Sequence, residues 1–169
     1  MRFITLLLAL TNCGQNVCEQ PYDFEVNGMC VYTNGKDITK ETLEYVVDVA
    51  EQTVTDRLGF SRNEMRHLNN NTVIHFVDYV SKMNDGETQA KRSWDHIDFD
   101  AVDSISMYVE YNEDIAFSSF PHELLHAIRY NLYGLDHVTH PRNWFCDYDD
   151  CSENPIEEKI YTAINNNRL

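Results

Sequence analysis

The sequence predicts a single α+β domain, because segments with helical periodicity are interleaved with segments that have the patterns of strands. A stripe of apolar residues at helical spacing runs from about Thr39 to Leu58. The apolar run 72–77 predicts a buried strand, and the alternation of apolar and polar residues from Ile105 to Tyr111 predicts a half-exposed one. A chain of 169 residues, 43% of them apolar, is long enough for one domain with its own core.

The first elements are expected to be a hairpin and a long helix. Asn27-Gly28 favours the positive φ angles of a two-residue turn, so residues 24–26 and 29–32 should pair as antiparallel strands. Gly59 is expected to end the helix that begins near Thr39. The side of this helix that should face the core consists of Leu43, Val46, Val47, Ala50, Val54 and Leu58.

Three further segments complete the expected layout. His75, inside the buried strand, is interpreted as a hydrogen-bonded structural residue and not as a ligand. Residues 81–100 are polar and rich in Asp, Lys and Asn, which predicts a long exposed loop. A last helix should start at Asn154-Pro155 and place Ile156, Ile160 and Ile164 on one face.

The stretch from Ser118 to Pro141 carries the chemistry, because it contains His122-Glu123-Leu124-Leu125-His126. Two histidines four residues apart on a helix lie on the same face, so their imidazole nitrogens can bind one ion while Glu123 flanks it. This spacing predicts a zinc site.

The sequence around these histidines supports a helix. Ser118 or Ser119 can cap its start, Pro121 is tolerated in its first turn, and Gly134 is expected to end it. One arc of the helix should contain Leu124, Leu125, Ile128 and Leu132, and a separate arc His122, His126, Arg129, Tyr130 and Tyr133.

A catalytic zinc ion normally takes three protein ligands and leaves the fourth position to water, so one more ligand is needed. Gly134 lies eight residues after His126, which carries the end of the helix away from the ion and requires the chain to turn back. His140 has the longer reach and is the favoured third ligand, with His137 as the alternative. A carboxylate is the remaining choice, either Asp136 or Glu157.

The segment resembles the active-site helix of the zincin metallopeptidases, and Gly134-Leu135-Asp136-His137 resembles the second half of the metzincin motif at a longer spacing. The resemblance covers about a fifth of the chain. It implies a zincin-like fold with a small mixed sheet, an early helix, an active-site helix and a C-terminal helix. It also implies a Zn²⁺-dependent peptidase in which Glu123 is the general base. The family expects an oxyanion donor, for which the candidates are Tyr130, Tyr133, Tyr148, Tyr161 and Arg142.

The net charge of −15 argues against nucleic acid as a partner, because phosphate binding needs Lys and Arg in excess. The resemblance to the zincin metallopeptidases implies that the partner is a peptide or protein substrate. The acidic residues are interpreted as a solvated surface, with a calcium site between Asp147 and Glu158 as the alternative.

Residues 1–12 combine one basic residue with a short apolar run, which predicts a signal peptide followed by a single domain over 13–169. Leu10-Thr11-Asn12-Cys13 resembles a bacterial lipobox, although Asn12 stands where that motif prefers a small residue. The resemblance implies lipidation of Cys13 and a membrane contact only through this anchor. The alternatives are cleavage without lipidation and an apolar start that is not cleaved.

Five cysteines leave one odd thiol, and assigning Cys13 to lipid leaves four that can pair in three ways. Proximity in sequence favours Cys18 with Cys30 and Cys146 with Cys151. Disulfides predict an oxidising compartment outside the cytoplasm.

The function that competes with a zinc peptidase is a non-catalytic exported surface lipoprotein in which zinc only stabilises the fold.

Overall fold

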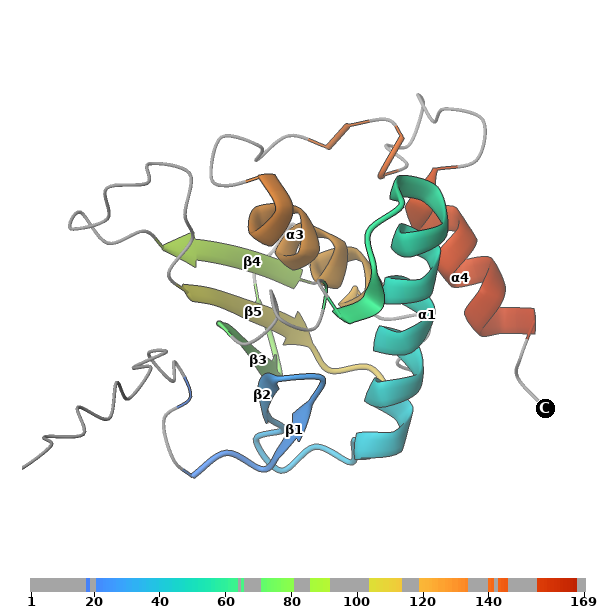
Figure 1. Ribbon diagram of the computed structural model, residues 1–169. Helices are drawn as coiled ribbons and strands as arrows, with labels where there is room; N and C mark the ends of the chain where they lie inside the picture. Colours follow the sequence, from blue (N-terminus) through green and yellow to red (C-terminus); the bar gives the residue numbers. More distant parts are fainter. Residues whose placement is uncertain are drawn as a thin grey trace, which may run out of the picture.

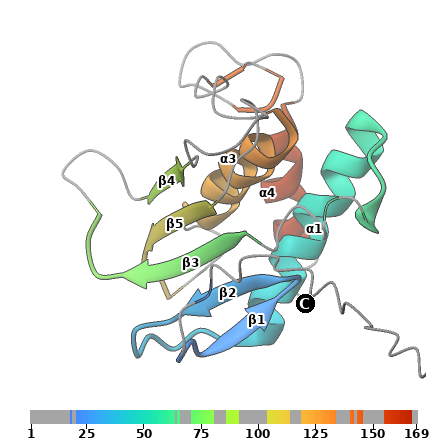
Figure 2. The ribbon, with the colours of Figure 1, turned by 60° about the vertical axis from the view of Figure 1, so that its left-hand side comes forward.

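The computed structural model describes residues 18, 21–63, 65, 71–80, 86–91, 104–113, 119–133, 140–141, 143–145 and 155–166. Over these residues the chain forms a mixed sheet of five strands with three helices on one side of it (Figures 1 and 2). The predicted α+β class is confirmed. The elements are β1 (Phe24–Val26), β2 (Met29–Tyr32), α1 (Lys40–Leu58), β3 (Thr72–Val77), β4 (Gly86–Lys91), β5 (Ser104–Glu110), α3 (Phe120–Tyr133) and α4 (Ile156–Asn166).

The predictions that depend on local signals are confirmed. Asn27 and Gly28 adopt φ angles of 48° and 88° in the turn between β1 and β2, which pair as antiparallel strands. Thr39 caps α1 by accepting a hydrogen bond from the backbone N–H of Thr42 at 3.2 Å, and Gly59 ends the helix with a φ of 78°. These residues meet the special backbone demands of turns and helix ends.

The strand order is β1-β2-β3-β5-β4, with β2, β3 and β5 parallel and both edge strands antiparallel to their neighbours. The predicted loop 81–100 is therefore wrong over 86–91, which forms the edge strand β4. Its polar sequence is explained by its position, because the side chains of Glu87 and Gln89 are exposed. The half-exposed strand near 105–111 is confirmed, but it lies inside the sheet and is not its edge.

The core lies between the sheet and the helices. The apolar residues of β3 and β5 that face the helices, such as Phe76 and Met107, are fully buried. Helix α4 packs on α1 and α3 and forms an outer part of the helical layer (Figure 1). Arg129 and Tyr130, expected on the arc that lies off the core stripe, are buried, and Arg129 lies against the rings of Trp144 and Phe145.

His75 lies in a row of stacked rings across the sheet. It is in register with Tyr32 of β2 and Tyr108 of β5, and the ring centroids are 4.8 Å and 5.1 Å apart. The structural role expected for His75 is thus carried by ring stacking. Burial lowers the pKa of His75 from its ordinary value of 6.5.

This stack predicts a pH dependence of stability. The folded-state pKa of His75 is lowered, so neutral His75 contributes its stability fully above the unfolded-state pKa, and the contribution decreases as the pH falls through the lower value. His75→Phe keeps a ring in the stack but cannot be protonated. We expect this variant to lose less unfolding free energy than wild type between about pH 7.5 and about pH 5, measured by urea unfolding. Equal losses in both proteins would contradict the assignment.

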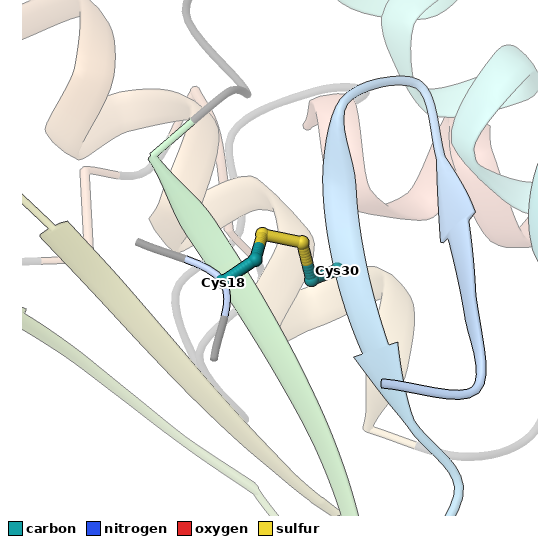
Figure 3. Close-up of a disulfide and its surroundings, with 2 residues drawn as sticks. All are labelled: Cys18 and Cys30. Carbon is teal, nitrogen blue, oxygen red and sulfur yellow. A yellow bond between two sulfur atoms is a disulfide. The ribbon is translucent and has the colours of Figure 1, made fainter. Parts of the chain in front are cut away.

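Cys18 and Cys30, predicted to pair, form a disulfide with their Cα atoms 5.9 Å apart (Figure 3). The bond ties the segment before β1 to β2, and it suggests an oxidising environment. None of the helices in the described part of the chain is sufficiently long and apolar to cross a lipid bilayer. The predictions for residues 1–12, Cys13, and the Cys146–Cys151 pair fall outside the described residues.

Candidate metal centre

Three histidines from two separate segments converge. The Nε2 atoms of His122 and His126 are 3.2 Å apart, and those of His126 and His140 are 2.9 Å apart. Each residue offers one ligand atom, and these atoms all lie within 4.8 Å of one another, so the group could hold a metal ion. His140 is exposed and His122 is partly exposed, so the cluster is open to solvent on the side of His140.

Local structure explains how the three rings meet. His122 and His126 are one turn apart on α3, as their spacing predicts. His140 comes from the short segment 140–145, in which Pro141 O accepts hydrogen bonds from the backbone N–H groups of Trp144 (2.8 Å) and Phe145 (3.1 Å). This turn, which follows His140, places the ring of Phe145 against the imidazoles of His122 and His126 on α3.

The chemistry of the donors fits a cation better than it fits hydrogen bonds. Each neutral imidazole has one N–H, and His122 uses its Nδ1–H on a carboxylate, which leaves Nε2 as a lone pair. Burial is the largest cause that lowers the pKa of His126 to about 3, so this ring is neutral. A neutral His126 Nε2 cannot satisfy both neighbouring Nε2 atoms with one proton. A metal ion can, since Zn–N bonds of 2.0–2.1 Å in tetrahedral geometry separate the nitrogens by about 3.4 Å.

Glu157 of α4 lies behind the cluster. Its Oε1 is 2.7 Å from His122 Nδ1, so it accepts the hydrogen bond that orients this imidazole. Glu157, one of the two carboxylate alternatives for the third ligand, thus contacts His122 on the side of the ring away from Nε2. The backbone N–H of Glu157 donates to Trp144 O at 2.9 Å, which connects α4 to the segment that carries His140.

This contact leads to a prediction about metal affinity. Carboxylates that orient a ligating histidine typically contribute about 10–100-fold to metal affinity, because they fix the tautomer and the ring orientation. We expect Glu157→Ala to weaken zinc binding by this factor, measured by competition with a chromophoric chelator. Glu158→Ala is the control, because Glu158 is the neighbouring exposed residue. Equal affinities in the two variants would show that Glu157 does not orient His122.

Glu123 is 5% exposed and points toward the edge strand. Thr88 Oγ1 donates a hydrogen bond to Glu123 Oε2 at 2.6 Å. Gly86 leaves room for this side chain, because a Cβ at Gly86 would lie 2.5 Å from Glu123 Cγ and 2.7 Å from Oε1. Burial raises the pKa of Glu123, and the hydrogen bond from Thr88 opposes that shift.

Comparisons with known proteins add no family to this geometry. No protein-family model, curated protein or solved structure matches this chain. The functional interpretation therefore depends on the arrangement of the side chains themselves.

Three of the other predicted site residues, all tyrosines, are described by the structure, and four lie outside the described residues. Burial raises the pKa of Tyr130 and of Tyr161, and the charge of Glu123 acts in the same direction on both, so each keeps its hydroxyl proton near the centre. Tyr133 is 38% exposed and packs edge-on against Trp144 with ring centroids 6.1 Å apart. The other predicted ligands and donors lie outside the described residues: Asp136, His137, Arg142 and Tyr148.

Sequence reasoning missed three contributors to the centre. Gly86 and Thr88 lie in the segment predicted to be a loop, so their contact with Glu123 was not expected. Phe145 is buried, and its ring contacts all three histidines. Its position five residues after His140 was the only signal in the sequence.

Proposed function

We propose that this protein is an exported zinc-dependent peptidase of the zincin type. The observation that carries the proposal is the convergence of three imidazole Nε2 atoms beside a carboxylate on the same helical turn. Three histidine ligands with one position left to water are typical of catalytic zinc sites, whereas structural sites usually have four protein ligands. Imidazole also binds other transition metals, so zinc itself is part of the proposal.

When bound, zinc would supply a Lewis acid that polarises the peptide carbonyl and acidifies water. Glu123 would accept a proton from the attacking water and deliver it to the leaving amine. The hydrogen bond from Thr88 to Oε2 holds one carboxylate oxygen and leaves Oε1 for the proton. The buried setting of Glu123, which raises its pKa, suits a group that must take up and release a proton near neutral pH.

The substrate is proposed to bind along the free edge of strand β4. This strand is antiparallel to β5, and it packs against α3 through Gly86 and Thr88. An extended peptide can add to such an edge through backbone hydrogen bonds, which would align it beside the metal helix. Because β5 lies between β3 and β4, only the outer side of β4 is free at this end of the described sheet.

Export is part of the proposed function. The Cys18–Cys30 disulfide supports an oxidising compartment. The apolar start of the chain and Cys13 support a signal peptide and a lipid anchor.

A second function is favoured by a specific observation. The histidine cluster joins α3 to segment 140–145, and Glu157 adds α4, so an ion there would fasten three parts of the fold. Zinc would then contribute folding free energy without catalysis.

The test is a metal-dependent hydrolysis assay. The protein is purified without chelators, its zinc content is measured by mass spectrometry, and cleavage of dye-quenched casein is followed before and after treatment with 1,10-phenanthroline. The peptidase proposal requires cleavage that disappears with the zinc and returns when zinc is added. One zinc per chain without cleavage would favour the stabilising role, and absence of bound zinc would reject both.

A further inference from the structure

One phenylalanine contacts all three imidazoles of the candidate centre. The ring centroid of Phe145 is 4.5 Å from that of His126, 4.9 Å from that of His122 and 4.9 Å from that of His140. The His126 ring is nearly parallel to the phenyl ring, with an interplanar angle of 25°. Phe145 is 1% exposed, so this ring closes one side of the cluster to water.

Hydrogen bonds of the backbone fix the position of Phe145. The backbone N–H of Phe145 donates to Pro141 O, and the carbonyl of the preceding residue, Trp144, accepts a hydrogen bond from the backbone N–H of Glu157. The guanidinium carbon of Arg129 lies 5.8 Å from the phenyl centroid and 5.5 Å from the Trp144 ring. Such cation–π contacts add to the packing of the two aromatic rings.

A phenyl ring suits this place chemically. It has no lone pair and no conventional hydrogen-bond donor, so it cannot compete with a metal ion for the imidazole nitrogens. Its van der Waals contacts restrict the rotation of all three side chains before any ion binds. Fixing ligands in advance reduces the ordering cost of binding, which is a general source of affinity.

We propose that Phe145 is a positioning residue for the metal centre: it presets the three histidine rings and thereby raises metal affinity and fixes the coordination geometry. This inference rests on the proposed metal site but not on peptidase activity. The proposed role of Phe145 differs from core packing, because Phe145 should raise metal affinity and other buried phenylalanines should not.

The test uses Co²⁺ as the metal, because its visible absorption band depends on coordination geometry. Phe145→Leu is compared with wild type by Co²⁺ titration of the purified chain. We expect a dissociation constant at least about tenfold higher and a weaker visible band, as for other residues that orient metal ligands. Phe145→Met, which keeps more of the side-chain length, is the second variant if Phe145→Leu does not fold.

Phe76→Leu is the matched control. Phe76 is also fully buried, but its ring packs on Phe120, with centroids 5.8 Å apart. We expect this variant to lose thermal stability like Phe145→Leu and to bind Co²⁺ within about twofold of wild type, because the changed ring does not orient a ligand.

The outcomes separate the two ideas. If Phe145→Leu and Phe145→Met bind Co²⁺ with the affinity and spectrum of wild type, or if Phe76→Leu weakens binding equally, the positioning role is wrong while the metal site stands. If wild type itself binds no Co²⁺, both the metal site and the role of Phe145 are wrong.

Discussion

Glu123→Gln is expected to retain zinc and to lose hydrolysis by a factor of about 10²–10⁴, the usual contribution of a general base. The reason is that the amide cannot accept the proton of water, while it keeps the size of the carboxylate and can still accept the hydrogen bond from Thr88. Zinc content and casein cleavage are measured on the same preparation. Glu158→Gln serves as the charge-matched control, because that side chain is exposed on α4.

The same variant should be at least as stable as wild type. Burial is the largest cause of the raised pKa of Glu123, so the ionised carboxylate costs folding free energy at neutral pH, and a neutral amide removes that cost. If Glu123→Gln melts at or above the melting temperature of wild type but no longer cleaves casein, Glu123 contributes to activity and not to stability. A variant that cleaves casein as fast as wild type would exclude Glu123 as the base.

Local chemistry explains which parts of this fold were predictable. A few adjacent residues determine the Asn27-Gly28 turn, the start of α1 near Thr39, its end at Gly59 and the i, i+4 spacing of the two histidines. Their physical requirements are therefore written in short stretches of sequence.

Contacts between distant segments explain what was missed. Strand β4 was predicted as a loop because an edge strand with an exposed side has no continuous apolar pattern. Gly86 and Thr88 of this strand contact Glu123 on α3. Thr88 and Glu123 are 35 residues apart in the sequence. The contact between Glu157 and His122 also spans 35 residues, so the sequence suggested Glu157 only as an alternative third ligand and not as the partner of His122.

The assignment of the third ligand leads to the second large effect. His140 Nε2 lies 2.9 Å from His126 Nε2, although His140 belongs to a different segment and is exposed. We expect His140→Ala to weaken zinc binding by roughly 10²–10³-fold. This range follows from sharing the 10–16 kcal/mol of a typical zinc site among four ligands, about 2.5–4 kcal/mol each. Zinc affinity is measured by chelator competition, and the variant should also lose casein cleavage.

His137→Ala is the informative comparison, because His137 was the alternative ligand and lies only three residues away in the chain. A histidine that does not bind the ion should change zinc affinity by less than about threefold, which corresponds to about 0.7 kcal/mol. The opposite ranking, with His137→Ala the more damaging change, would mean that segment 140–145 does not deliver the ligand. It would also remove the reason for Phe145 to contact three rings at once, because that contact depends on His140 occupying the cluster. Conversely, if only His140→Ala strongly lowers zinc affinity, the third ligand, the turn at Pro141 and the ring of Phe145 all belong to the metal centre.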